Sequence, residues 1–248
     1  MMSTLNTRFT VGLAALLSVF VAGCSTRTQE KIRIACVGNS ITYGSGTTNR
    51  VTDSYPAQLA ALLGNAYEVG NFGRNGATLL NRGELPYSKC EEYRKALDFH
   101  PDMVFIKLGT NDSKLVNRVY LDDFVADCLS LIRSFRELPN RPTVVLLLPV
   151  PVFSRDTVSI TASVVETKII PMIRQAADAE NCAVVDLHSL MLDSEHLFPD
   201  KVHPSTAGAA VIARQVAEFV VQRQSAEFVV QRHGTSRKST DTERNSIK

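Results

Sequence analysis

Five short strand-like segments, most of them apolar, are spread along the chain between longer segments and constrain the fold more than any other feature. Their length predicts buried strands, and they cover residues 32–37, 68–72, 103–108, 143–148 and 182–186. The segments that predict helices are residues 54–63, 90–99, 121–136, 166–180 (with Pro171 near its start) and 204–223. Strands that alternate with helices along a whole domain form a parallel sheet with right-handed crossovers and helices on both faces. We therefore predict an α/β fold, a three-layer α/β/α sandwich around a mostly five-stranded parallel sheet.

The composition fits one globular domain. The chain has 248 residues, of which 44% are hydrophobic and 21% charged, and this is enough to bury a sizeable core. The formal net charge is only +2, Trp is absent and aromatic residues make up 7%. Such a sequence offers neither a basic stripe for a phosphate backbone nor a platform for stacked bases. We expect no nucleic-acid partner.

The N-terminus predicts export. Arg8 precedes an apolar run over residues 11–21, which is shorter than a helix that spans a bilayer. The run ends in Val21-Ala22-Gly23-Cys24, which resembles a bacterial lipobox. The resemblance implies cleavage before Cys24 and acyl chains on that residue, and several acyl chains anchor a protein firmly. We expect a lipid anchor at Cys24 and a place in the bacterial cell envelope, periplasmic or at the cell surface; the alternative is an ordinary cleaved signal peptide with a chance cysteine.

The other four cysteines do not resemble a disulfide framework or a metal site. Cys36, Cys90, Cys128 and Cys182 are scattered, and no pair has C-x-x-C spacing. Their even number in an exported protein would permit disulfides. Because Cys36 and Cys182 lie in apolar runs, we predict that both are buried thiols.

A near-tandem repeat marks the end of the predicted domain. Residues 217–223 and 226–232 both read Ala-Glu-Phe-Val-Val-Gln-Arg, and a polar tail follows. A nine-residue period is too short for a solenoid unit, so we interpret the repeat as a local duplication that extends the last helix or lies beyond it. The predicted organisation is a signal peptide (1–23), a tether (24–30), one folded domain (31–223) and a duplicated, polar and disordered tail (224–248).

Polar or glycine clusters follow the first three predicted strands, and a fourth cluster opens the last helix. They are residues 38–42 (Gly-Asn-Ser-Ile-Thr), 71–78 (Asn-Phe-Gly-Arg-Asn-Gly-Ala-Thr), 109–112 (Gly-Thr-Asn-Asp) and 198–204 (Phe-Pro-Asp-Lys-Val-His-Pro). Sites in parallel α/β folds gather at the carboxyl ends of strands. Each cluster alone is weak evidence, because Ser, Asn and Asp also cap helices and stop strands.

Together the clusters contain the parts of a nucleophilic site. A serine needs a base to take its proton, the base needs a third group to orient it, and a tetrahedral oxyanion needs preorganised donors. Ser40 follows the first strand, and Asn111 supplies an amide at the same edge. Asp200 stands three residues before His203, a spacing that can bring its carboxylate to the imidazole in a turn. The alternative is that Asp200 only solvates the loop and His203 only caps the helix.

In this order the four clusters resemble the sequence blocks of the SGNH or GDSL hydrolases, over about residues 31–222. The resemblance implies a flavodoxin-like fold for the sheet. It also implies that Ser40 is the nucleophile and that Asp200 and His203 complete a catalytic triad. No metal or other cofactor is implied, and no particular oligomeric state.

The same resemblance implies an oxyanion hole formed by the backbone N–H groups of Ser40 and Gly76 and by the Asn111 side chain. Gly76 is preferred to Gly73 because the second block of the family has its glycine five residues after an asparagine, which is Asn71 here.

One position departs from the family pattern. The family usually has Asp before the serine, and this chain has Asn39, which keeps hydrogen bonding but loses a charge. Asp186 with His188 is a competing pair that matches no block of the family. The sequence has no G-x-S-x-G elbow, phosphate-binding loop or H-E-x-x-H helix.

The resemblance implies a serine esterase that acts through an acyl-enzyme. The stretch over residues 38–112, with Ser54-Tyr55-Pro56, is most similar to bacterial sialate and other carbohydrate O-acetylesterases. We therefore expect small acyl esters, acetyl first, on carbohydrates. Two alternatives stay open: a lysophospholipase or thioesterase of the same fold, and a catalytically silent glycan-binding lipoprotein.

Overall fold

A computed structural model describes the backbone of residues 30–244 and the side chains of residues 30–225. The apolar N-terminal run and Cys24 lie outside the described residues, so the predicted lipid anchor stays a prediction.

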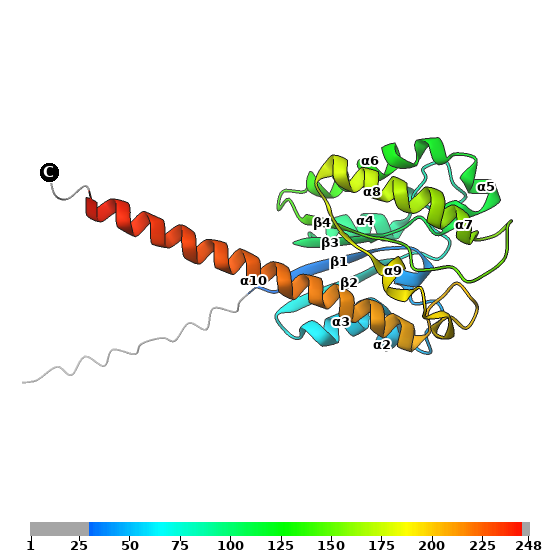
Figure 1. Cartoon of the computed structure of the whole chain (residues 1–248), viewed down its shortest axis with the longest axis horizontal. Coiled ribbons are helices and arrows are strands. Elements are labelled where there is room, and N and C mark those ends of the chain that lie inside the picture. Colours follow the sequence, from blue (N-terminus) through cyan, green and yellow to red (C-terminus); the bar gives the residue numbers. More distant parts are fainter. Residues whose placement is uncertain (1–29, 245–248) are drawn as a thin grey trace, which may run out of the picture.

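Five parallel strands form the central sheet, in the order β2-β1-β3-β4-β5 (Figure 1). The strands are β1 (Ile32–Gly38), β2 (Tyr67–Gly73), β3 (Met103–Lys107), β4 (Thr143–Leu147) and β5 (Ala183–Val185). All five predicted strands are present, and β5 is the shortest. The chain runs outward from β1 to β2 and then crosses back to β3, so the strand order reverses between β1 and β3. In open α/β sheets, ligands bind outside the carboxyl ends of the strands at this point of reversal.

Helices cover both faces of the sheet, which confirms the predicted three-layer α/β/α fold (Figure 1). The helices are α1 (Ser40–Tyr43), α2 (Arg50–Asp53), α3 (Tyr55–Leu63), α4 (Glu91–Asp98), α5 (Leu115–Arg118), α6 (Phe124–Arg136), α7 (Ala162–Val164), α8 (Ile170–Glu180), α9 (Leu187–Met191) and α10 (Thr206–Arg244). Short 3₁₀ turns cover Tyr87–Lys89, Asn111–Ser113, Leu121–Asp123 and Glu195–Leu197. Helices α4, α6 and α8 lie on one face, and α3, α9 and α10 on the other.

The side chains of β1 alternate between two cores, as the period of a strand requires. Ala35 and Val37 pack under α4, α6 and α8, whereas Ile34 and Cys36 pack under α3 and α10. A strand buried on both faces is apolar along most of its length, which explains why β1 was recognisable as a strand in spite of Arg33 near its start.

Helix α6 shows why the surrounding segments are helical. Its buried side chains recur at the spacing of one helix face, and they are Phe124, Cys128, Leu131, Ile132 and Phe135. Burial of each large apolar side chain contributes roughly 1.5–3 kcal/mol. A π-helical turn over Val165–Ile169 runs directly into α8, and Pro171 is the second residue of α8. A proline has no N–H to donate inside a helix, and π turns are a known local departure from the regular hydrogen-bond pattern.

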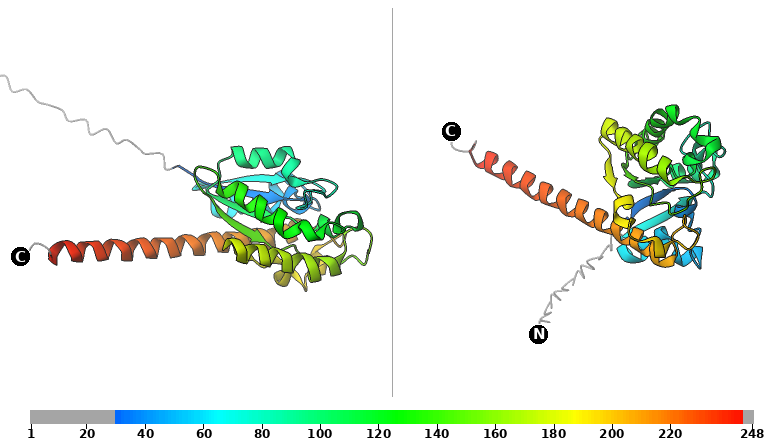
Figure 2. Two further views of the ribbon diagram at one scale, coloured as in Figure 1. Left: turned by 90° about the horizontal axis from the view of Figure 1, so that it is seen from above. Right: turned by 45° about the vertical axis from the view of Figure 1, so that its right-hand side comes forward.

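Helix α10 is longer than the predicted helix over residues 204–223. Its backbone is helical through Arg244 and therefore includes both copies of the repeat, and it projects from the body of the domain (Figures 1 and 2). Tyr67 donates a hydrogen bond to Gln224 at 2.6 Å, which ties the helix to the end of β2 nearest the amino terminus of that strand. The predicted domain boundary at residue 223 stays a prediction.

The four described cysteines are free thiols. Cys36, Cys90 and Cys128 are buried, whereas Cys182 is half-buried, so the prediction of full burial for Cys182 was wrong. Cys182 lies just before β5, at the end of the sheet, where fewer side chains cover it.

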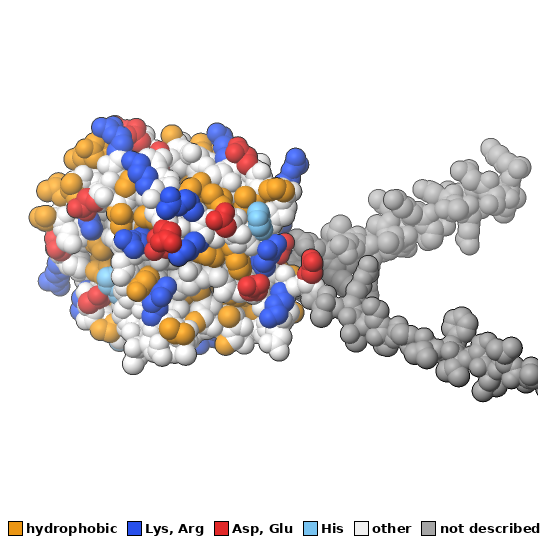
Figure 3. Space-filling model, turned by 180° about the vertical axis from the view of Figure 1, so that it is seen from behind, with side chains coloured by type: hydrophobic (Ala, Val, Ile, Leu, Met, Phe, Trp, Pro, Cys, Tyr) orange, Lys and Arg blue, Asp and Glu red, His pale blue; other side chains and the backbone are white. Residues whose placement is uncertain are grey.

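The surface mixes charges of both signs. Lys and Arg side chains lie beside Asp and Glu side chains over the face shown in Figure 3, which agrees with the near-neutral net charge. Among the residues that the structure describes, none of the helices combines the length and the apolar character needed to cross a bilayer.

Candidate active site

Ser40 stands at the carboxyl edge of the sheet, as the first residue of α1 directly after β1. The Asn39 side chain accepts a hydrogen bond from the N–H of Ile41 at 3.1 Å and so caps this one-turn helix. Gly44 ends the helix with a φ of 106°, a conformation that favours glycine. The strand and the two caps fix the position of the serine, whose exposed fraction is 9%.

His203 lies far from Ser40 in the sequence but contacts it in the structure. The Ser40 Oγ lies 2.8 Å from the His203 Nε2, a hydrogen bond between residues 163 positions apart. His203 precedes α10, and the start of that helix packs against α2 and α3, which hold it next to the serine turn.

Asp200 contacts the other ring nitrogen of His203. Its Oδ2 lies 2.6 Å from the His203 Nδ1, and its Oδ1 accepts the backbone N–H groups of Val202 and His203 at 3.0 and 2.6 Å. Lys201 has a φ of 66°, an uncommon conformation for a residue with a side chain, and it turns the loop tightly enough for these contacts. Phe153 donates its N–H to the Lys201 carbonyl at 2.8 Å, which anchors the loop.

The Asp200 carboxylate is ionised at neutral pH. Burial alone raises the pKa of Asp200, but the backbone N–H and ring of His203 and the N–H of Val202 outweigh it, and the net pKa lies below the ordinary 3.8. An ionised carboxylate at Nδ1 keeps the proton on that nitrogen, which leaves Nε2 to accept the hydrogen of the Ser40 hydroxyl.

Gly46 supports His203 and was not identified from the sequence. It has a φ of 93°, and a Cβ at this position would lie 2.9 Å from the His203 Cβ and 2.6 Å from the Pro204 carbonyl oxygen. Only a glycine therefore lets the loop after α1 pack this closely against the imidazole. The Gly44-Ser45-Gly46 stretch was the available signal, but its partner lies more than 150 residues away.

Asn111 contacts the backbone of the residue that follows Gly76. Asn111 Nδ2 donates to the carbonyl of Ala77, the residue after Gly76, at 2.9 Å. Asn111 is 3% exposed, and the second hydrogen of its amide is available to another acceptor. Gly76 has a φ of 77°, which favours glycine at this position.

Gly73, the alternative to Gly76, serves packing instead. A Cβ at Gly73 would lie 2.1 Å from the backbone nitrogen of Tyr43, so this glycine lets the end of β2 approach α1. Asn71 orients the same turn, because its Oδ1 accepts the N–H of Gly73 at 3.0 Å.

The competing pair of Asp186 and His188 is not brought together as a base and its orienting carboxylate. Asp186 accepts the N–H of Ser189 at 2.8 Å as the cap of α9 and pairs with Arg174 at 2.7 Å. His188 Nδ1 lies 3.3 Å from the Pro149 carbonyl oxygen. These residues have structural partners of their own.

A buried lysine lies beside the end of β1. Lys107, the last residue of β3, is directly opposite Gly38 in the parallel register and has no exposed surface. Burial lowers its pKa from 10.5 to about 7. Within the described part of the chain, neither the Lys107 Nζ nor the Asn39 Nδ2 has a hydrogen-bond partner. Asn39 therefore uses its oxygen as a cap and leaves its amide nitrogen unpaired.

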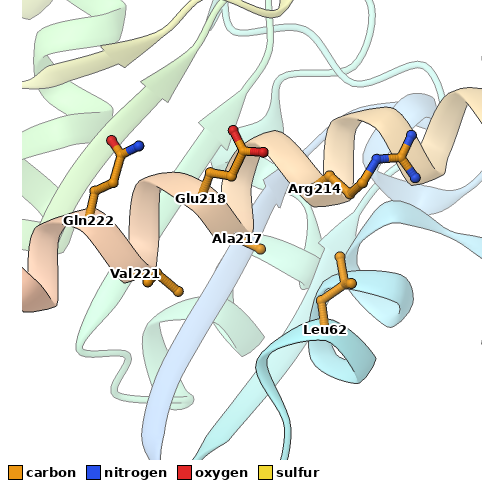
Figure 4. A pocket seen from close by; sticks show the side chains of 6 residues that line it. All are labelled: Leu62, Arg214, Ala217, Glu218, Val221 and Gln222. Carbon is orange, nitrogen blue, oxygen red and sulfur yellow. The ribbon is translucent and has the colours of Figure 1, made fainter.

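A groove elsewhere on the domain lies between α3 and α10 (Figure 4). It has a volume of about 380 Å³ and is lined by Leu62, Arg214, Ala217, Glu218, Val221 and Gln222. This lining contains no serine, cysteine or histidine that could act as nucleophile or base. Across the described residues, we also find no group of three His, Cys, Asp or Glu side chains arranged to hold a metal ion.

Comparison with known proteins assigns the chain to a family. A model of the GDSL-like Lipase/Acylhydrolase family matches residues 36–211. The chain belongs to this family. The match includes all four polar clusters and confirms the predicted family.

A curated relative gives a second comparison. The chain is 37% identical to an acetylxylan esterase from Xylanibacter ruminicola, over 76% of this chain and 43% of the relative. The chain therefore spans less than half of the length of this relative.

Solved structures share the fold at lower identity. A carbohydrate acetylesterase family member from Sinorhizobium meliloti has a TM-score of 0.61 at 20% identity, over 76% of this chain and 97% of that one. An aryl esterase from M. smegmatis has a TM-score of 0.62 at 18% identity, over 77% and 99%. A two-domain esterase active on acetylated mannans has a TM-score of 0.57 at 20% identity, over 77% and 49%. At these identities the comparisons establish the fold.

Proposed function

We propose that this chain is a serine esterase that removes small acyl groups, acetyl first, from carbohydrates through a Ser40-His203-Asp200 triad. The observation that carries the proposal is the continuous line of hydrogen bonds from the Ser40 Oγ through both ring nitrogens of His203 to Asp200, at 2.8 and 2.6 Å. This is the arrangement by which a base activates a serine and a carboxylate orients the base.

In the first half of the reaction, His203 Nε2 takes the proton of Ser40 as the Oγ attacks the ester carbonyl carbon. The carbonyl oxygen becomes an oxyanion, which the N–H groups of Ser40 and Gly76 and the Asn111 amide stabilise. His203 then returns the proton to the alcohol oxygen as the carbon–oxygen bond breaks, and an acyl-enzyme on Ser40 remains.

In the second half, water replaces the alcohol. His203 takes a proton from the water as its oxygen attacks the acyl carbon, and the proton passes to Ser40 when the acid leaves. Asp200 remains ionised throughout and stabilises the imidazolium that forms in each half. Its lowered pKa supports this role.

The names of the relatives support acetylated carbohydrate as the substrate class. The acetylxylan esterase, the carbohydrate acetylesterase and the esterase active on acetylated mannans all act on acetylated sugars by name. An acetyl ester of a polysaccharide is therefore the substrate that we expect first.

The test is hydrolysis of p-nitrophenyl acetate, butyrate and octanoate by the purified protein, with Ser40→Ala as the matched control. We expect acetate to be cleaved fastest and the variant to be inactive, after which acetylated xylan and acetylated mannan oligosaccharides are compared by acetate release. A preference for octanoate would instead favour the lysophospholipase or thioesterase alternative.

The silent glycan-binding alternative is tested by covalent labelling. A fluorophosphonate probe reacts only with an activated serine, so the wild-type protein should be labelled and Ser40→Ala should not. An unlabelled wild-type protein with an intact circular dichroism spectrum and cooperative unfolding would overturn the esterase proposal.

We also propose that the protein is exported and lipid-anchored at Cys24. The supporting observation is the short apolar run that ends in Val21-Ala22-Gly23-Cys24. Cells expressing the full chain should incorporate radiolabelled palmitate into it, and the Cys24→Ala variant should not. Equal incorporation by both would contradict the anchor.

A further inference from the structure

A second carboxylate is buried beside the candidate site, and the proposed triad does not use it. Asp112 follows Asn111 in the 3₁₀ turn after β3 and has no exposed surface. Burial raises its pKa to about 6, although backbone N–H groups oppose the rise. Burial of a carboxylate is costly unless its oxygens are hydrogen-bonded, so the contacts of Asp112 indicate what it does.

Asp112 binds the segment that follows Gly76. Its Oδ2 accepts the N–H of Leu79 at 3.1 Å and its Oδ1 accepts the N–H of Leu80 at 2.8 Å. This segment belongs to no helix or strand, so its buried N–H groups depend on partners from other parts of the chain. Asn111 donates to Ala77 in the same segment. Two consecutive side chains therefore hold three residues of the segment.

Asn117 closes the connection from the far end of the segment. This side chain is 1% exposed. Its Oδ1 accepts the N–H of Glu84 at 2.8 Å, and its Nδ2 donates to the Asn111 carbonyl at 2.8 Å. It thus links residue 84 directly to the backbone of Asn111, whose amide is a proposed oxyanion donor.

These contacts meet a specific need of the proposed reaction. Two of the three proposed oxyanion donors, the Gly76 N–H and the Asn111 amide, lie on different segments: Gly76 belongs to no helix or strand, and Asn111 begins a single 3₁₀ turn. Donors must hold their positions to within about 0.5 Å to stabilise a transition state. Something must therefore fix the two segments relative to one another.

We infer that Asp112 and Asn117 are positioning residues that fix the distance between the Gly76 N–H and the Asn111 amide. They do so through the backbone of residues 79, 80, 84 and 111 and do not touch the substrate. The inference rests on the proposed function, because it concerns the oxyanion hole of that reaction.

The test compares Asp112→Asn with a control substitution of Asp127, a second carboxylate that binds the loop after Gly76. Asp127 of α6 accepts the N–H and the side-chain amide of Asn81, each at 2.7 Å, and within the described residues these side-chain hydrogen bonds do not reach residues 76–80 or 111. In Asp112→Asn an NH₂ group replaces one acceptor and faces a backbone N–H. We expect kcat for p-nitrophenyl acetate to fall about 10- to 100-fold with KM changed less than about threefold. We expect Asp127→Asn to change kcat less than about threefold.

A double-mutant cycle with Asn111→Ala separates positioning from general loosening. If Asp112 acts by positioning the oxyanion donors, the fold-losses of Asp112→Asn and Asn111→Ala should combine to less than their product. The same cycle against Asp200→Asn should be multiplicative. Should Asp112→Asn fail to unfold cooperatively, Asn117→Asp carries the test: it keeps the acceptor for Glu84 and loses the donor to Asn111, and kcat should fall about tenfold.

The outcomes are distinct. A folded Asp112→Asn with wild-type kcat, an equal loss in Asp127→Asn, or multiplicative losses with Asn111→Ala would each overturn the inference while the esterase proposal stands. Wild-type activity no higher than that of Ser40→Ala would overturn the proposed function, and the inference would fall with it.

Discussion

The two sides of Ser40 are held together in different ways. On the triad side, Asp200 and His203 are three residues apart and bind each other within one turn, and the Asp200 side chain is 55% exposed. On the oxyanion side, Asn111 reaches Ala77 across 34 positions, and Asp112 reaches Leu80 across 32, all in the buried interior. The contacts on the triad side join residues close in sequence and are partly exposed to water. The contacts on the oxyanion side join residues far apart in sequence and are buried.

This difference predicts how substitutions will act. A change on the triad side should remove chemistry and leave folding almost intact, because few buried groups lose partners there. A change on the oxyanion side should reduce both turnover and stability, because it leaves buried polar groups unsatisfied. The following predictions test that contrast, from the largest expected effect to the smallest.

Ser40→Ala should lower kcat by about 10⁴-fold or more, because no other group can form the acyl-enzyme. The free energy of unfolding should change by less than about 1 kcal/mol, since the hydroxyl makes one side-chain hydrogen bond, to His203. Steady-state hydrolysis of p-nitrophenyl acetate measures kcat, and urea unfolding measures the free energy of unfolding. A large loss of stability in this variant would contradict the expectation that substitutions on the triad side leave folding almost intact.

Asp200→Asn should lower kcat by about 10³- to 10⁴-fold, because an amide cannot hold the His203 proton on Nδ1. The pH dependence carries a second expectation. The folded pKa of Asp200 lies below its ordinary 3.8, so its stabilising contribution is complete above pH 3.8 and is lost as the pH falls through the folded value. Unfolding followed from pH 7 to pH 3 should therefore show no loss attributable to Asp200 above about pH 4, whereas a loss near pH 6 that disappears in Asp200→Asn would contradict this.

Asn111→Ala should lower kcat by about 10²- to 10³-fold, the usual loss for one oxyanion donor. In contrast to Ser40→Ala, it should also cost about 1–3 kcal/mol of stability, because the buried Ala77 carbonyl loses its partner. Both are measured on one preparation by initial rates and urea unfolding. Wild-type stability in this variant would show that the oxyanion side is not held as the contacts indicate.

These contrasts explain what the sequence could reveal. The clusters that contain Ser40, Asp200 and His203 could be found because each is local: a strand and a turn for the serine, and a three-residue spacing for the acid and base. Each cluster alone was weak evidence, and it was their order, which resembles the blocks of the SGNH or GDSL hydrolases, that made these residues candidates. The parallel sheet was predictable because strands buried on both faces, such as β4, are nearly continuous apolar runs.

The supporting residues were not predictable, since their signals are not local. Asp112 is an ordinary Asp after a strand and Asn117 an ordinary Asn in the short helix α5, and only the fold places them against residues 79, 80 and 84. Gly46 stands in a glycine-bearing loop whose contact with His203 depends on how the ends of the domain meet. The buried Lys107 lies in an apolar run that a charged residue would not ordinarily join.

Lys107→Met gives the smallest expected effect on catalysis and tests whether every buried polar group near the site matters for turnover. Lys107 has no hydrogen-bond partner within the described residues, so replacing it with an apolar side chain of similar length leaves no polar group without a partner.

The pH dependence of stability gives the measurement. The folded pKa of Lys107, about 7, lies below the ordinary 10.5, so the unfolded chain binds more protons than the folded protein between these values. Wild-type stability should therefore rise with pH from about 7 to 10.5. Lys107→Met should lose this rise with pH and should be more stable than wild type at pH 7. Each 1 kcal/mol of added stability would raise Tm by about 2–4 °C. The kcat of the variant should stay within about threefold of wild type. Calorimetric scans of both proteins at pH 7 and pH 10 measure the change in Tm. A lower Tm for the variant at pH 7 would mean that Lys107 has a stabilising partner. A large fall in kcat would mean that Lys107, like Asp112 and Asn117, helps to position the oxyanion donors.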